Sequence, residues 1–247
     1  MMKWNKKEAI MKKLGSMVLS AALLALPASG IAAYQAADVK DGGSISGTVK
    51  FKGTAPAPKK LDVGKDKEVC DKSPKVDQSL IVNNGNLANA VVTITDIQKG
   101  KKIATQKVTL DQKGCEYQPH VLAFPAGTTV EILNPDGILH NVHSYSKANS
   151  PFNQAMPKFK KSLTVKIDKP EVIEVKCDVH GWMHGWLVSA PTPYVAVTDN
   201  SGAFKLTDVP AGSYTVEVWH EKLGKSTQKV TVKGKEEAKV NFEMAGK

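Results

Sequence analysis

The amino-acid sequence predicts an all-β protein built from antiparallel sandwiches. Short alternating segments such as SISGTVKF and NAVVTITDI recur along the chain, each bounded by Gly, Asn or Pro. Turn signals, TDNSGAF and VPAGSY, join such segments near the C-terminus. Long amphipathic helix patterns are missing from the sequence. A chain of 247 residues with 41% hydrophobic residues can build one large core or two modest ones.

The first 33 residues have the pattern of a secretory signal. Lysines precede the apolar run LGSMVLSAALLAL, and the small residues of PASGIAA follow it. We expect cleavage near Ala32 or Ala33 and a mature protein that is periplasmic or extracellular, with Met11 as an alternative initiator. An uncleaved anchor is the alternative, but the apolar run is short for a membrane-spanning helix. We therefore expect no stable membrane span after cleavage.

Secretion guides the interpretation of the three cysteines, because disulfides persist in oxidising compartments. Three cysteines cannot all pair within one chain. Cys70 and Cys115 lie in polar, turn-like sequence that suits a disulfide, whereas Cys177 ends the alternating segment VIEVKC and has histidine neighbours. We predict a Cys70–Cys115 disulfide and a Cys177 thiol that is available for chemistry. A buried, inert thiol is the alternative for Cys177.

The formal net charge is +10, and every basic residue other than histidine is a lysine. Without the bidentate fork of arginine, recognition of guanine and phosphate is poor, so we expect no nucleic-acid partner. A lysine-rich surface keeps a secreted protein soluble and can steer it towards an acidic partner.

Residues 105–190 resemble a cupredoxin in two places. The segment GTTVEILNPDGILHNV has the pattern that leads a strand of that family into its first copper histidine, here His140. The segment CDVHGWM has the Cys-x2-His-x2-Met spacing of amicyanin-like members, although Gly181 stands where those relatives commonly have proline. The resemblance implies one mononuclear copper per chain, with these ligands: His140, Cys177, His180 and Met183.

The residue types agree with that implication. A thiolate and two imidazoles in a trigonal plane, with a weak axial thioether, are the donors of a blue copper site. One loop can supply three of these donors. The fourth, His140, lies about forty residues earlier in the sequence and must come from a neighbouring strand. Trp182 and Trp186 are expected either to form an apolar shell around the metal or simply to fill the core.

Other histidines offer alternative ligands. His143 could replace the first copper histidine, from which it is three residues away. His184 in place of Met183 would give one cysteine and three histidines, a set more suitable for zinc. We expect His120 to lie beside the ligands or to be structural, and His220 to lie at the surface of the other sandwich.

The tail VTDNSGAFKLTDVPAGSYTVEVWHEK resembles the carboxypeptidase regulatory-like (transthyretin-like) fold. The tail alone has too few strands for a sandwich, and SISGTVKFKG and LANAVVTI match the missing opening strands. We therefore expect a cupredoxin Greek-key sandwich inserted in, or tandem with, a transthyretin-like β-sandwich, in which residues 44–51 and 88–95 pair with 203–243. The expected division is 1–33 signal, 42–104 first strands and a loop, 105–190 cupredoxin domain and 191–247 remaining strands.

The whole chain resembles secreted methylamine-utilisation or plastocyanin-like proteins. One mononuclear copper without an evident substrate pocket favours a one-electron carrier. Its expected partner is a redox protein such as an acidic c-type cytochrome, contacted through an exposed His180 imidazole. We expect no enzyme activity, because no nucleophile triad or carboxylate pair stands out and Asp178 points away from its neighbour Cys177. The alternatives are a copper storage or delivery protein and a structural or adhesive β-module with a stabilising metal site.

Overall fold

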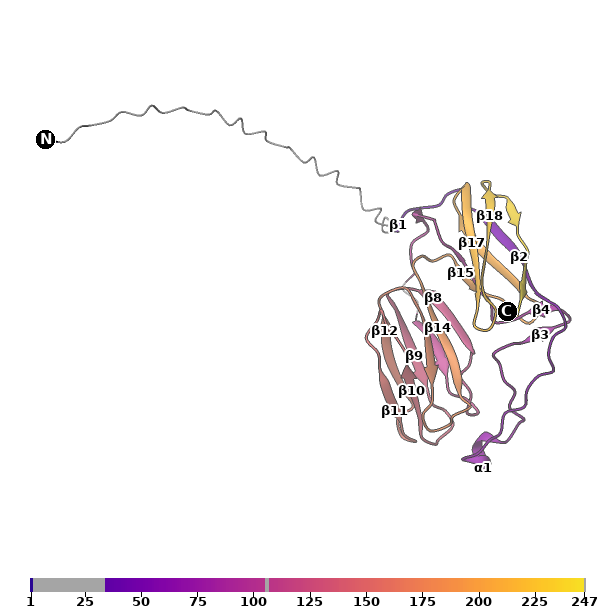
Figure 1. Ribbon diagram of the computed structural model, residues 1–247, viewed down its shortest axis with the longest axis vertical. Helices are drawn as coiled ribbons and strands as arrows, with labels where there is room; N and C mark the ends of the chain where they lie inside the picture. The colour runs from indigo at the N-terminus through magenta and orange to yellow at the C-terminus, as the bar shows by residue number, and fades with distance from the viewer. Residues whose placement is uncertain (2–33, 105–106, 247) are drawn as a thin grey trace. The chain divides into compact units, whose positions relative to one another are not determined.

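The computed structural model describes Met1 and residues 34–104 and 107–246 (Figure 1). Apart from Met1, the expected signal segment lies outside the described residues. Within them regular structure is almost entirely strand, so the all-β prediction is confirmed; the one helix of this part of the chain is α1, Lys67–Cys70. No helix of the described part is long and apolar enough to cross a membrane.

Residues 107–190 form one sandwich of two sheets, called here the inserted sandwich. Its larger sheet has the strand order β11-β10-β13-β14-β8, and its smaller sheet has the order β12-β9-β7. β14 runs parallel to β8, whereas β13 is antiparallel to both β10 and β14. The strands are β7 (Lys107–Asp111), β8 (Val121–Pro125), β9 (Thr128–Leu133), β10 (His140–Ser144), β11 (Asn153–Met156), β12 (Ser162–Ile167), β13 (Glu171–Lys176) and β14 (His184–Ala190).

Period-two alternation explains why these two sheets close on one core. In β9, Val130 and Ile132 are fully buried, whereas the residues between and after them are half-buried. Ile173 of β13 and Leu187 of β14 are fully buried from the opposite sheet. Each such side chain stabilises the fold by about 1.5–3 kcal/mol relative to exposure. The packed core gives a fixed frame for the loops at the ends of β10, β13 and β14.

A second sandwich, called here the split sandwich, is built from both ends of the described chain. One sheet has the order β15-β5-β17-β18, and the other has the order β16-β2-β4-β3, with β19 and β20 also paired to β2. A separate short pair joins β1 to β6. The strands are β1 (Gln35–Ala36), β2 (Gly43–Lys52), β3 (Val82–Asn83), β4 (Asn86–Leu87), β5 (Val91–Ile94), β6 (Lys99–Gly100), β15 (Val195–Val197), β16 (Ala203–Val209), β17 (Gly212–His220), β18 (Gly224–Val232), β19 (Glu237–Lys239) and β20 (Phe242–Ala245).

The predicted pairing of the early strands with the tail is confirmed. Ile45 of β2 faces Leu206 of β16, and Val92 of β5 faces Val218 of β17. All four side chains belong to one buried cluster. The first and last strands therefore share a core, with the inserted sandwich between them in sequence. The domain limits at residues 105 and 190 stay a prediction.

The chain between β2 and β3 leaves the split sandwich and carries α1 (Figure 1). Residues 53–81 of this segment are called here the covering segment. The predicted disulfide is present between Cys70 in this segment and Cys115 in the inserted sandwich. Both cysteines are fully buried in the core cluster of the inserted sandwich, together with Val63. The covering segment is therefore fastened to the inserted sandwich by a covalent bond and by apolar packing.

Candidate metal centre

Three predicted ligands meet where β10 and β14 begin and β13 ends. His140 opens β10, Cys177 follows β13, and His180 lies in the loop before β14. The Nδ1 atoms of the two imidazoles are 2.9 Å apart, and the Cys177 Sγ atom is 3.8 Å from Nδ1 of His180. Exposed fractions are 0% for both histidines and 2% for the cysteine. All three donor atoms lie within 4.8 Å of one another, which suits a single metal ion.

The loop that follows Cys177 is closed by backbone hydrogen bonds. The Met183 N–H donates to the His180 carbonyl at 2.9 Å, and the Cys177 N–H donates to the Met183 carbonyl at 3.2 Å. Met183 is 2% exposed and packs in the same cluster as Cys177. A Cβ atom at Gly181 would meet nothing within 4 Å. Glycine in place of the expected proline therefore leaves this closed loop intact.

Each of the two imidazoles is held by a carboxylate on its far nitrogen. Nε2 of His140 lies 3.0 Å from Oδ2 of Asp136, and Nε2 of His180 lies 2.9 Å from Oδ2 of Asp66. Because an ionised carboxylate only accepts, both Nε2 atoms carry a proton, and in the neutral form of each imidazole Nδ1 presents a lone pair. Two facing lone pairs repel each other, and a cation between them would remove that repulsion. Carboxylates bonded in this way orient histidines that ligate metals.

The charges around Cys177 favour its thiolate form. Burial raises the pKa of this thiol, but hydrogen bonds from His140 and from nearby backbone N–H groups outweigh burial and lower the pKa overall. Burial lowers the pKa of His140, but its hydrogen bonds to Asp136 and Cys177 raise the pKa overall. Burial also lowers the pKa of His180, and the bond to Asp66 offsets this only in part. A thiolate is the form of cysteine that binds metal ions.

His180 is not at the surface, so the prediction of an exposed imidazole is wrong. Its side chain is 0% exposed, and Asp66 of the covering segment lies over its Nε2 atom. Asp66 has φ of 49°, in the left-handed region that aspartate tolerates better than most residues, and it lies directly before α1. The disulfide at Cys70 fastens the same short segment to the inserted sandwich. Asp66, which contacts the buried His180 imidazole, is itself 29% exposed.

Only one of the two tryptophans lies against a ligand. The Trp182 ring lies 5.1 Å from the His180 ring, and its Nε1–H donates to the Cys115 carbonyl at 3.1 Å. Trp186 packs on Trp219 of the split sandwich at a ring distance of 5.3 Å. Trp182 therefore lies beside the donor atoms, and Trp186 joins the two sandwiches.

The remaining histidines occupy three different surroundings. His143 is partly exposed and its Nδ1 atom bonds to Asp178 at 3.1 Å, outside the Cys177 group. His120 and His184 belong to a separate group with Glu221. His220 is fully buried, so its predicted surface position is wrong. It continues the inward face of β17, and burial lowers its pKa to about 4.

Three carboxylates that contact these histidines are not distinguished by the sequence pattern. Asp136 lies four residues before His140, so sequence proximity could have drawn attention to it. Asp66 lies 114 residues before its partner histidine, and Glu221 lies 101 residues after His120. Contacts of such separation have no local signal in one sequence. The additional residues are Asp66, Asp136 and Glu221.

Comparisons with known proteins concern different parts of the chain. Residues 186–245 match the family model described as carboxypeptidase regulatory-like domain, as expected from the sequence of the tail. No curated protein matches the chain. Among solved structures, the chain is similar to a copper-containing nitrite reductase from Thermus scotoductus, with 24% identity and a TM-score of 0.33. That match covers 36% of this chain and only 24% of the reductase chain.

Two other similar structures are a cupredoxin and an amicyanin by their names. A purple cupredoxin from Nitrosopumilus maritimus is 21% identical, and the match covers 34% of this chain and 99% of that chain with a TM-score of 0.29. A Cu(I) form of an amicyanin mutant is 20% identical, and the match covers 36% and 87% of the two chains with a TM-score of 0.32.

Proposed function

We propose that the chain is a secreted type 1 copper protein that carries single electrons. Two imidazole Nδ1 atoms and a thiolate sulfur converge in a buried space, and this observation supports the proposal most directly. These donors are the trigonal set of a blue copper site, and bound copper supplies a one-electron redox couple. The proposed ligands are His140, Cys177, His180 and Met183.

In this proposal Met183 rather than His184 would be the fourth residue that holds the ion. Met183 is buried in the cluster that contains Cys177, and its backbone closes the ligand loop. The Nε2 atom of His184 instead lies 3.1 Å from the Glu221 carboxylate, in the second group. The geometry therefore supports a weak thioether donor over a third imidazole, which would favour zinc.

The protein's contribution to electron exchange is a donor set that stays in place. His140 is fixed by the pairing of β10 with β11, and Cys177 directly follows the paired strand β13. Asp136 and Asp66 fix the orientation of the two imidazole rings. Ligands held by strands and hydrogen bonds move little when the charge at the site changes by one electron.

Electrons would pass through the covering segment rather than through an exposed imidazole. Asp66 contacts the buried His180 imidazole and is partly exposed, and the neighbouring Lys65 and Lys67 are exposed. Their positive charges favour an acidic redox partner, such as an acidic c-type cytochrome. Exchange with such a partner should slow as ionic strength rises, because salt screens charges over about 10 Å at 0.1 M.

Copper titration of the full-length protein tests the proposal. We expect one copper per chain and an intense visible thiolate-to-copper band. Cys177→Ser should abolish the band, whereas His143→Ala should preserve it because His143 lies outside the Cys177 group. A colourless protein that binds zinc tightly and refuses copper would overturn the proposal.

Copper delivery is the competing function, and burial argues against it. The proposed ligands are 0–2% exposed, and a disulfide fastens the covering segment next to them. Release of copper to an acceptor should therefore be slow. We expect reversible one-electron voltammetry and little transfer of copper to an apo-acceptor. Ready copper transfer without electron exchange would favour delivery instead.

A further inference from the structure

A second group of metal-binding side chains lies apart from the Cys177 group. His120 directly precedes β8, His184 opens β14, and Glu221 lies in the turn between β17 and β18. One donor atom from each of the three lies within 4.8 Å of the others. The inserted sandwich supplies both imidazoles, and the split sandwich supplies the carboxylate.

The Glu221 carboxylate contacts one imidazole with each of its oxygens. Nε2 of His184 lies 3.1 Å from Oε2, and Nε2 of His120 is in close contact with Oε1. The side chains of His120 and Glu221 are 5% and 4% exposed, and that of His184 is 25% exposed. A carboxylate is therefore buried between two nitrogen donors.

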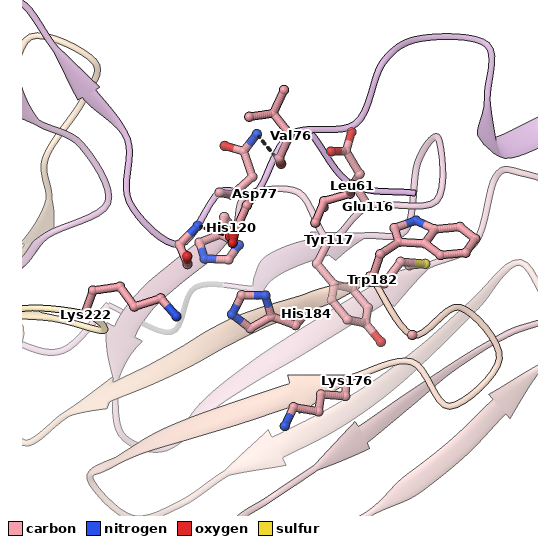
Figure 2. Close-up of a pocket in the computed structure, with 14 residues that line it drawn as sticks. Leu61, Val76, Asp77, Glu116, Tyr117, His120, Lys176, Trp182, His184 and Lys222 are labelled. Carbon is pink, nitrogen blue, oxygen red and sulfur yellow. Dashed lines mark hydrogen bonds between the residues drawn. The ribbon is translucent and has the colours of Figure 1, made fainter. Parts of the chain in front are cut away.

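The group opens on a pocket of about 260 Å³. Figure 2 shows the His120 and His184 rings close together in this pocket, and their centroids are 4.8 Å apart. Asp77 and Glu116 line the same pocket and interact electrostatically with these imidazoles. Lys222 is also part of the lining, so the acidic side chains are partly balanced. The pocket has room for a water molecule next to the two imidazoles.

We propose that His120, His184 and Glu221 form a second metal site, which binds a divalent ion of the zinc class. Two imidazoles and one carboxylate, with a fourth position open to water, are donors that zinc accepts. The 3.1 Å separation between nitrogen and oxygen fits two ligand atoms at about 2.0–2.2 Å from one ion. No thiolate belongs to this group, so its preference differs from that of the Cys177 site.

An ion in this site joins the two sandwiches. Glu221 follows the last residue of β17, whereas His120 and His184 belong to the inserted sandwich. His184 also directly follows Met183, so the second site adjoins the loop that closes over the Cys177 site. Occupancy therefore stabilises the contact between the sandwiches and fixes the start of β14.

Zinc titration of the full-length chain tests the proposal in a background that carries Cys177→Ala and His140→Ala. These changes remove two donors of the first site, so its copper chemistry does not enter the result. We expect calorimetry to show one Zn²⁺ per chain, together with a higher Tm. Adding Glu221→Gln should weaken Zn²⁺ binding at least about tenfold, because even partners outside the ligand set contribute about 10–100-fold.

His143→Ala in the same background is the matched control, since this partly exposed histidine also bonds to a carboxylate but belongs to neither group. It should leave Zn²⁺ binding unchanged. If Glu221→Gln does not unfold cooperatively, His184→Asn decides, because His184 is the most exposed member. Lost Zn²⁺ binding with an unchanged circular dichroism spectrum supports the site. No saturable Zn²⁺ binding, or equal affinity in a folded variant, overturns it and leaves a hydrogen-bonded ion triad.

Discussion

Replacing Asp66 by alanine removes the carboxylate that holds the His180 imidazole. Their 2.9 Å contact is charge-assisted, and hydrogen bonds to charged groups are worth about 1.5–3 kcal/mol. Asp66 is 29% exposed, so solvent screening reduces this to about 1–2 kcal/mol. If copper binding depends on that orientation, Asp66→Ala should weaken it by about 5–30-fold, since 1.4 kcal/mol is tenfold. Asp136, only 8% exposed, should have a larger effect.

Competition between the copper-loaded protein and a chelator measures this change. Asp66→Asn keeps an acceptor without the charge, so its copper affinity should lie between those of the wild type and Asp66→Ala. Asp62→Asn is the matched control, because Asp62 is an exposed carboxylate of the same covering segment. Equal affinity in Asp66→Ala and the wild type, or an equal loss in Asp62→Asn, would show that the Asp66–His180 contact does not support copper binding.

Three further predictions concern stability. Cys70→Ser with Cys115→Ser opens a loop with a sequence separation of 45 and should lower the free energy of unfolding by about 4 kcal/mol, measured by denaturant titration against the oxidised wild type. Ile132→Ala should cost about 2–5 kcal/mol by the same measurement, because this side chain is fully buried; no change would contradict the packed core. Burial raises the pKa of Glu171, but hydrogen bonds from Ser146 and its neighbours lower it to about 2. The Glu171 carboxylate therefore stabilises the fold fully above its unfolded pKa of 4.5 and loses this effect as pH falls through about 2. Glu171→Gln should lower the free energy of unfolding at pH 7, and the stabilities of variant and wild type should converge near pH 2.

The parts of the fold that could be predicted are those with a local pattern. Alternation marked the long strands, and the spacing of Cys177, His180 and Met183 marked the ligand loop. Two-residue strands are too short to show the alternation of a β-strand; these are β1, β3, β4 and β6. The four-residue helix α1 is likewise too short to show the hydrophobic period of a helix. Their positions depend on tertiary contacts.

The surroundings of the predicted ligands depend on distant segments in the same way. The covering segment looked like a polar loop, and nothing in its composition showed that Asp66 would lie over His180. His220 is expected at the surface from the sequence, whereas the alternation of β17 continues through it and turns it inward.

The shared core of the split sandwich constrains the order in which the chain can fold. The backbone N–H of Thr48 in β2 donates a hydrogen bond to Oδ1 of Asn241, which is 193 residues further along the chain. The inserted sandwich is complete at β14, so its strands can pair while β2 still lacks the partner strands that come later in the chain. Thr93 of β5 and Val195 of β15 are partners in the sheet, so the whole insert lies between two paired residues, like the loop of a hairpin. Once the insert has folded, the loop that remains to be closed is much shorter than the sequence suggests, which reduces the entropy cost of bringing the two ends of the chain together.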